Sequence, residues 1–176
     1  MPEPDRPLWA PWRVEYVRGP KAEGCVFCRA LAAGEDREHL VLHRGESTFV
    51  VLNRFPYTSG HLMVVPRRHV ALPEDLSAAE ASELWAMLAT SKRALDAFLA
   101  PQGYNVGLNL GAAAGAGVAD HLHLHVVPRW VGDTNFMPVI GDVRVVSQHL
   151  LDVYDGLAAR FSTDRAEAHG RGGARG

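Results

Sequence analysis

Hydrophobic residues recur along the chain at two spacings, and these spacings predict which segments form helices and which form strands. Between residues 77 and 99, leucine, methionine and phenylalanine return every three or four positions, which places their side chains on one face of a helix. Ser77 and Glu80 match a capping box, in which each side chain accepts a hydrogen bond from the backbone N–H of the other residue. We therefore expect one long helix over residues 77–99, closed by Pro101.

Shorter runs of apolar and β-branched residues, bounded by glycine, proline and charged turns, predict the strands of a sheet. These runs cover residues 39–43, 47–53, 61–66, 104–110 and about 118–127. A short helix is expected to begin at Cys25 and to stop near Gly34, and a last helix to cover about residues 146–161. Strands interrupted by one main helix predict an α+β fold, with an antiparallel sheet of about five strands, one long helix and a C-terminal helix.

The two ends of the chain differ in composition from the segment between them. Residues 1–24 are rich in proline and tryptophan, and we expect an extended arm whose indoles at Trp9 and Trp12 pack on another surface. Residues 25–162 are expected to form the folded domain. Residues 163–176 are expected to be a disordered tail, because they offer almost no apolar surface to bury.

Length, charge and cysteine content narrow the class of protein. A chain of 176 residues fits one domain. Its 18 basic and 20 acidic residues give a formal charge of −2, which excludes a protein that coats a nucleic-acid polymer but leaves room for a local pocket for a small phosphate ligand. No apolar run has the length of a membrane span, the N-terminus lacks a signal-peptide pattern, and two cysteines are too few for a disulfide scaffold. We therefore expect a cytoplasmic protein that is not associated with a membrane.

Histidine is the residue type that points to chemistry. The chain has nine histidines, and three of them alternate with apolar residues in the run His121-Leu122-His123-Leu124-His125. On a strand these imidazoles share one face, about 7 Å apart, while the leucines line the other. Imidazole nitrogens need polar partners and pack poorly in a core, so this face is predicted to be functional rather than a solvated polar surface. The alternative is a hydrolytic metal site formed by the three histidines, for which Asp120 is the nearest acidic candidate.

These residues carry a resemblance to a known family. The alternating histidines, the segment Gly60-His61-Leu62-Met63-Val64-Val65-Pro66 and Asn109 resemble the histidine triad (HIT) superfamily of nucleotide hydrolases and transferases, over roughly residues 8–140. Residues 53–57, 107–111 and 128–136 are similar to the branch that contains bacterial diadenosine tetraphosphate phosphorylases. The resemblance implies a HIT-like fold and a homodimer.

The resemblance also implies a catalytic mechanism. His123 would attack an α-phosphorus and form a covalent nucleotidyl-histidine, which water or phosphate then resolves. An unperturbed imidazole is largely neutral near pH 7, and the second ring nitrogen needs a proton anchored on an acceptor such as a backbone carbonyl. His125 is the candidate donor to the phosphate or to the departing oxygen. The backbone N–H groups of residues 111–117, including Ala116 and Gly117, suit the phosphate oxygens because small residues let the main chain approach an anion.

The resemblance assigns three further residues to nucleotide binding. Asn109 would contact the phosphates, Asn53 the ribose hydroxyls, and His61 lies near the active site of related proteins. A turn or capping role is the alternative for each asparagine, and a structural role is the alternative for His61. The chain departs from many family members before the first histidine, where Ala116 and Gly117 stand in place of a residue with a hydroxyl. This departure puts the contact to the leaving group, and with it the preferred substrate, in question.

Cys25 and Cys28 form a Cys-x-x-Cys unit that has three interpretations by itself: a redox pair, half of a zinc site or two buried thiols. The resemblance supplies two further ligands, His69 and His121. Together they form a Cys₂His₂ set, which is common in closed structural zinc sites. Such a site would pin the N-terminal segment to the catalytic strand and would remove His121 from acid–base chemistry.

The leading hypothesis is therefore an enzyme that cleaves dinucleoside polyphosphates, such as diadenosine tetraphosphate, or nucleotidyl conjugates. A nucleotide-binding HIT protein with little turnover, acting through protein partners, is the alternative. Uridylyl transfer between sugar phosphates ranks lower, because the related transferases carry His-Pro-His where this chain has leucine between its histidines.

Overall fold

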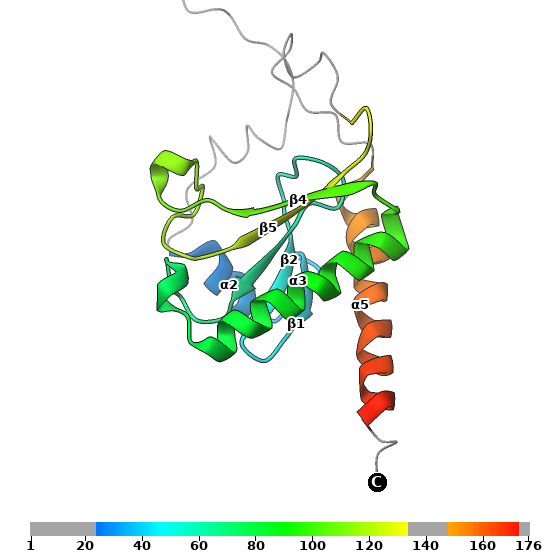
Figure 1. Cartoon of the computed structure of the whole chain (residues 1–176), viewed down its shortest axis with the longest axis horizontal. Coiled ribbons are helices and arrows are strands. Elements are labelled where there is room, and N and C mark those ends of the chain that lie inside the picture. The colour runs from blue at the N-terminus through cyan, green and yellow to red at the C-terminus, as the bar shows by residue number, and fades with distance from the viewer. Residues whose placement is uncertain (1–23, 134–147, 173–176) are drawn as a thin grey trace, which may run out of the picture.

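The computed structural model of the chain describes residues 24–133 and 148–172, and it has an α+β fold built on one sheet (Figure 1). The elements are α2 (Val26–Ala33), β1 (Val41–Arg44), β2 (Thr48–Leu52), β3 (Leu62–Pro66), α3 (Ala78–Leu99), β4 (Gly103–Leu108), β5 (Leu124–Arg129) and α5 (Leu150–Gly172), with short 3₁₀ turns at Pro73–Asp75 and Ala112–Ala114. The expected five-stranded antiparallel sheet and long central helix are confirmed. The expected N-terminal arm, with Trp9 and Trp12, lies outside the described residues.

The strand order places the histidine strand inside the sheet. The order is β1-β2-β3-β5-β4, and every neighbouring pair is antiparallel. β5 pairs with β3 through Leu62 opposite Val126 and Met63 opposite His125, and with β4 through Val106 opposite Val126. The sequence predicted that Pro128 ends the strand, but Pro128 lies inside β5. A proline is tolerated there because the pairing of β5 with β3 ends at Val126, so no backbone N–H is needed from Pro128 on that side.

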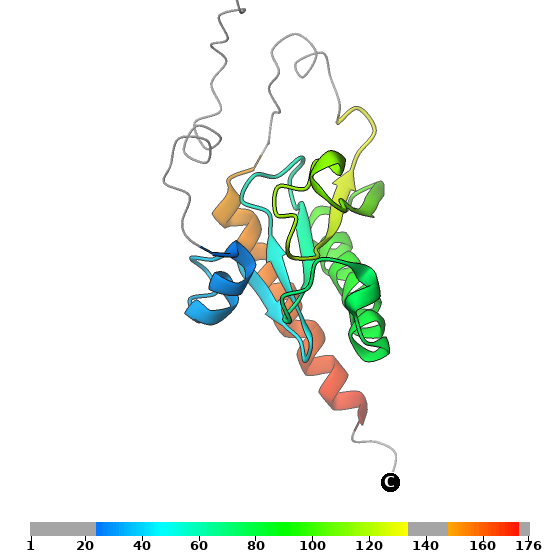
Figure 2. The same cartoon turned by 90° about the vertical axis from the view of Figure 1, so that its left-hand side faces the viewer.

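Helices cover the sheet and enclose the core. α3 packs against β2, β3 and β5, and α5 packs against β1 and α3. Figure 2 shows α2 and α3 on opposite sides of the sheet. The core cluster includes Phe49, Leu62, Leu95, Val126 and Leu157. Among the described helices, none is long and apolar enough to cross a membrane.

The local signals for helix ends agree with the structure. The capping box of α3 is present, with Glu80 N–H donating to Ser77 Oγ at 3.2 Å and Ser77 N–H donating to a Glu80 carboxylate oxygen at 2.8 Å. Gly34 ends α2 in the left-handed conformation at φ 75°, which glycine adopts without strain.

The expected C-terminal boundary is wrong. α5 continues to Gly172, so the segment from 163 onward that was expected to be disordered is helical over most of its length. The reason is that Asp164-Arg165-Ala166-Glu167-Ala168 lacks an apolar face but consists largely of good helix formers. The expected start of this helix at residues 146–147, and residues 173–176, lie outside the described part of the chain.

Candidate active site and metal cluster

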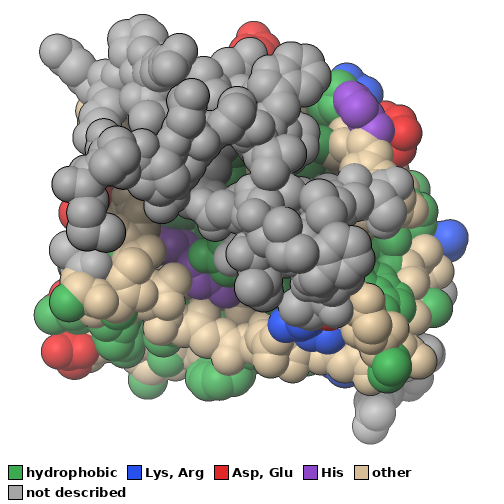
Figure 3. Space-filling view, turned by 90° about the horizontal axis from the view of Figure 1, so that it is seen from above, with side chains coloured by type: hydrophobic (Ala, Val, Ile, Leu, Met, Phe, Trp, Pro, Cys, Tyr) green, Lys and Arg blue, Asp and Glu red, His purple; other side chains and the backbone are tan. Residues whose placement is uncertain are grey.

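The three alternating histidines lie just before β5 and at its start. β5 begins at Leu124, so His121 and His123 precede the strand and only His125 belongs to it. The expected strand start at 118 is wrong, because the backbone N–H of Leu122 donates to Val70 O at 2.6 Å instead of joining the sheet. The His123 and His125 ring centres are 4.8 Å apart, closer than the spacing of an ideal strand. Figure 3, which views the molecule from above, shows histidine side chains grouped in a patch on its surface.

His123 has the hydrogen bonding that a nucleophilic imidazole requires. Its Nδ1 lies 2.8 Å from the backbone carbonyl oxygen of His121. A carbonyl can only accept, so Nδ1 carries the proton and Nε2 keeps its lone pair. Burial lowers the pKa of His123, which outweighs the opposite effect of its bond to the His121 carbonyl. The ring is therefore neutral at pH 7.

A chain of hydrogen bonds sets the tautomer of His125. Tyr57 N–H donates to Nδ1 of His61 at 3.1 Å, so the proton of neutral His61 sits on Nε2. That Nε2 lies 3.0 Å from Nδ1 of His125 and donates to it. His125 therefore holds its own proton on Nε2, which lies 3.4 Å from the terminal amide of Asn109. With this tautomer the amide of Asn109 turns its oxygen toward the Nε2–H, because the amide NH₂ group can only donate. Burial and the neighbouring His123 lower the pKa of His125 to about 4, so His125 is a neutral donor at pH 7.

The other residues that the sequence assigned to nucleotide binding are two asparagines and two small residues of a loop, and their surroundings differ from one another. Asn53 Oδ1 accepts from Phe55 N–H at 2.9 Å, which is the turn-forming role, while its Nδ2 lies 3.3 Å from Nδ1 of His61. Asn109 follows β4 and lies beside His125. Ala116 is half-buried and Gly117 is exposed in the loop between β4 and β5. The roles of these residues toward a nucleotide stay predictions.

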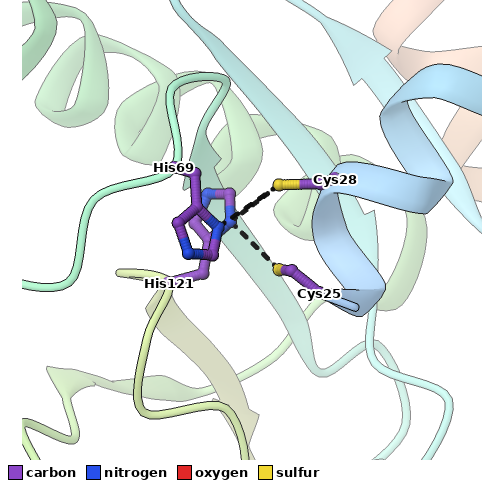
Figure 4. A group of neighbouring side chains, drawn as sticks. All are labelled: Cys25, Cys28, His69 and His121. Atoms are coloured by element: carbon purple, nitrogen blue, oxygen red, sulfur yellow. Dashed lines mark hydrogen bonds between the residues drawn. The ribbon is translucent and has the colours of Figure 1, made fainter. Parts of the chain in front are cut away.

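Cys25, Cys28, His69 and His121 converge from three parts of the chain (Figure 4). Their ligand atoms all lie within 4.8 Å of one another. Cys25 Sγ is 3.2 Å from His121 Nδ1, and Cys28 Sγ is 3.3 Å from His69 Nδ1 and 3.6 Å from His121 Nδ1. Around a tetrahedral zinc ion, sulfur and nitrogen ligands would be about 3.6 Å apart. The donor set and its spacing fit zinc, so of the three interpretations of the cysteine pair the geometry favours the metal site.

The surroundings of the cluster prepare its histidines as ligands. His121 Nε2–H donates to Pro66 O at 2.8 Å, which leaves the Nδ1 lone pair facing the thiols. His69 Nε2 lies 3.7 Å from a carboxylate oxygen of Asp120. Carbonyl and carboxylate partners of this kind orient metal-binding histidines. Burial lowers the pKa of His121, which keeps it in the neutral form that binds a metal.

The start of α2 explains why both thiols face the same point. Cys25 is the N-cap of α2 and Cys28 lies in its first turn, a spacing that puts two side chains on one side of a helix. Burial and the neighbouring Cys25 raise the pKa of the Cys28 thiol, an effect that a coordinated cation would reverse.

The hydrolytic three-histidine metal site does not form. Within residues 24–133 and 148–172, the groups that could hold a metal are the Cys₂His₂ cluster and the exposed set Glu35, Glu38 and His39. Neither contains His123 or His125.

Sequence reasoning missed two contributors to the site. Phe27 of α2 packs against both His121 and His123, with ring centres 5.4 Å and 5.1 Å apart. Its place between the two cysteines was the available signal. The other contributor is the backbone N–H of Tyr57, which no side-chain pattern reveals.

Comparison with known proteins agrees with this geometry. The model of the HIT domain matches residues 34–131. A protein of Mycobacterium tuberculosis named AP-4-A phosphorylase is 42% identical over 163 residues, which cover 88% of this chain and 84% of that protein. The bis(5'-nucleosyl)-tetraphosphatase [asymmetrical] of Schizosaccharomyces pombe is 28% identical over 93 residues, 53% of this chain and 50% of that protein.

A solved structure shares the fold over most of its length. The Zn-bound histidine triad family protein from Mycobacterium smegmatis superimposes with a TM-score of 0.66 at 26% identity, covering 82% of this chain and 97% of that one. The family model spans more than half of the chain, and the M. tuberculosis relative is similar along nearly all of it. The chain therefore belongs to the HIT family.

Proposed function

We propose that this chain is an enzyme that cleaves dinucleoside polyphosphates, such as diadenosine tetraphosphate, through a covalent nucleotidyl-His123 intermediate. The observation that carries the proposal is the pair of opposite tautomers on neighbouring rings. His123 keeps a lone pair on Nε2, while His125 keeps a proton on Nε2. One ring is thus a nucleophile and the other a donor. The name of the M. tuberculosis relative supports the choice of substrate.

The first step transfers a nucleotide to the protein. Nε2 of His123 attacks the α-phosphorus, a P–N bond forms, and the P–O bond to the leaving polyphosphate breaks. The positive charge that develops on the His123 ring is stabilised by its Nδ1–H bond to the His121 carbonyl, 2.8 Å long. His125 donates a hydrogen bond from Nε2–H to a phosphate oxygen or to the departing oxygen and keeps its proton, so the polyphosphate leaves as an anion.

The second step releases the nucleotide. Water or inorganic phosphate attacks the same phosphorus, the P–N bond breaks, and His123 returns to its neutral state. With diadenosine tetraphosphate the first product is ATP. Phosphate then yields ADP, and water yields AMP.

His61 and the asparagines support this chemistry in different ways. His61 is fully buried, so we assign it the role of holding His125 rather than touching nucleotide. Asn109, beside His125, is assigned to the phosphates. Asn53 is assigned to the ribose, in addition to the turn that it forms. The backbone N–H groups at Ala116 and Gly117 are assigned to phosphate oxygens.

We also propose that Cys25, Cys28, His69 and His121 hold a structural zinc ion, as their spacing supports. When bound, zinc supplies a closed cross-link and no open coordination position. The four residues join α2 to the segments that follow β3 and precede β5.

Two further proposals concern assembly and location. β4 is one of the two outer strands of the described sheet and exposes Val106, which supports a homodimer. Size-exclusion chromatography with light scattering tests this, and a monomeric mass contradicts it. Both cysteines are free thiols directed at histidines, which suits a reducing compartment such as the cytoplasm.

The test of the proposed function is incubation with diadenosine tetraphosphate, with and without inorganic phosphate. ADP formed only with phosphate identifies a phosphorylase, whereas AMP plus ATP without phosphate identifies a hydrolase. His123→Ala is expected to abolish turnover and covalent labelling, while His39→Ala, on the loop before β1, serves as the control. Full activity in His123→Ala contradicts the mechanism.

A nucleotide-binding protein with little turnover is the second candidate. The absence of a hydroxyl at Ala116 and Gly117 favours it, since one donor to the leaving group is missing. Tight AMP binding together with negligible turnover on every dinucleoside polyphosphate would select this candidate.

A further inference from the structure

His121 links the metal cluster to the nucleophile through two different parts of one residue. Its imidazole faces the thiols of Cys25 and Cys28, while its backbone carbonyl accepts the Nδ1–H of His123 at 2.8 Å. The carbonyl bond selects the tautomer that leaves Nε2 of His123 free. Any change in the backbone at His121 therefore reaches the nucleophile through one hydrogen bond.

The His121 ring is held from both sides. Nε2–H donates to Pro66 O at 2.8 Å, and Nδ1 lies 3.2 Å from Cys25 Sγ. The next residue is held as well, since Leu122 N–H donates to Val70 O at 2.6 Å. Without a ligand bond at Nδ1, one of these restraints is lost and the ring can turn about its remaining hydrogen bond.

α2 makes a second connection to the nucleophile. Phe27 packs against His123 with ring centres 5.1 Å apart, and it lies between the two cysteines. A helix of eight residues is too short to be stable alone, so its position depends on its attachments. At its C-terminal end Arg44 donates to Leu31 O at 2.8 Å. At its N-terminal end the attachments are the two thiols and the buried Phe27 ring.

We propose that α2 and His121 form a positioning unit for His123, so that loading of the Cys₂His₂ cluster sets the tautomer and orientation of the nucleophile. The inference rests on the proposed function, because it concerns the ring that takes up the nucleotide. His121 and Phe27 act as positioning residues in it and do not touch the substrate. Zinc contributes rigidity here and takes no part in the bond-making steps.

The experiment compares the full-length wild-type protein with Cys28→Ser, which removes one ligand, and with Glu83→Gln on α3. Glu83 does not contact the cluster, so Glu83→Gln controls for a loss of stability that leaves the ligands in place. Zinc content is measured by mass spectrometry of the metal. The His123 tautomer is measured by long-range ¹H–¹⁵N spectra of protein labelled on histidine. The rate of nucleotidyl-His123 formation is measured in single turnovers with diadenosine tetraphosphate, beside KM in the steady state.

We expect wild type and Glu83→Gln to hold one zinc ion per chain and a single Nδ1–H tautomer of His123. Cys28→Ser is expected to be folded, zinc-free and mixed in tautomer, with nucleotidylation slowed about 10-fold or more and KM changed much less. A folded, zinc-free Cys28→Ser protein with the wild-type tautomer and rate overturns the inference. A wild-type protein that holds no zinc overturns it as well.

A second variant decides the matter if Cys28→Ser does not fold. Phe27→Leu keeps all four ligands, so it is expected to retain zinc while nucleotidylation slows, and an unchanged rate and tautomer overturn the inference. If wild type forms no nucleotidyl-His123 at all, the proposed function fails. The tautomer spectra of wild type and of the variant then still decide this inference.

Discussion

The carboxylate of Glu83 on α3 is predicted to be a principal anchor of the turn between β1 and β2. It accepts from Glu46 N–H at 2.9 Å, from Ser47 N–H at 2.7 Å, from Thr48 Oγ1 at 3.0 Å and from the Ser47 hydroxyl. Thr48 is fully buried, so its hydroxyl has no access to water if Glu83 is removed. One side chain thus satisfies donors from three consecutive residues, two in the turn and the first of β2.

The replacement Glu83→Gln retains one acceptor oxygen and turns an NH₂ group toward the donors that the other oxygen held. Hydrogen bonds to a charged group contribute about 1.5–3 kcal/mol each, and partial exposure of the turn reduces this to about 1–2 kcal/mol. Two such bonds lost give an expected loss of about 2–4 kcal/mol in the free energy of unfolding. This is a large share of the roughly 5–15 kcal/mol of an ordinary domain.

The assay is urea unfolding followed by circular dichroism, at one fixed zinc concentration so that metal binding does not shift the midpoint. Glu74→Gln, at an exposed position in the 3₁₀ turn Pro73–Asp75, is the matched control and is expected to change stability by less than about 0.5 kcal/mol. A loss below about 1 kcal/mol in Glu83→Gln would refute the assignment of this carboxylate as an anchor.

The same carboxylate predicts a pH dependence with a definite sign. Burial alone would raise the pKa of Glu83, but the hydrogen bonds from Ser47, Thr48 and Glu46 outweigh it and lower the pKa. A group whose folded-state pKa is lowered contributes its full stability above its unfolded pKa of about 4.3 and loses it as the pH falls through the folded value. The stability difference between wild type and Glu83→Gln should therefore be constant near pH 7 and shrink below about pH 4. A difference that grows on acidification contradicts the reasoning.

Three further predictions concern packing, the proton arrangement and the metal. Gly156→Ala is expected to cost about 1–3 kcal/mol in thermal or urea unfolding, because its Cβ would overlap the ring of Phe98, and a gain from helix propensity alone would contradict this packing. His61→Ala is expected to lower kcat about 10- to 100-fold with little change in KM, because His125 loses the donor that fixes its tautomer, and an equal rise in KM would indicate nucleotide contact instead. Chelation is expected to remove one zinc ion per chain and to lower the free energy of unfolding. The expected loss is about 2.7 kcal/mol relative to protein at a free zinc concentration 100 times Kd. An absence of metal in the purified protein, together with unchanged stability of Cys28→Ser, would refute the zinc site.

Local patterns in the sequence determined much of the fold and singled out the candidate reacting groups. The capping box at Ser77 and the recurrence of apolar residues behind it specify α3, because helix formation depends on neighbours three and four positions apart. The Cys-x-x-Cys spacing brings two thiols to one side of a helix start for the same reason. The alternation at His121, His123 and His125 marked the candidate active-site segment from the sequence alone.

Only the tertiary structure decided which nitrogen of His123 and of His125 carries a proton, and therefore which ring can accept and which can donate at Nε2. His125 meets His61 because β3 and β5 pair with Met63 opposite His125, a register set by the burial of whole strands. The start of β5 at Leu124 depends on the bond from Leu122 to Val70, and the anchoring of His121 depends on the Pro66 carbonyl. These partners are far apart along the chain. The periodicity of a sequence does not say which distant groups will come into contact in the folded protein. That choice is made when the sheet assembles and buries its polar groups with partners.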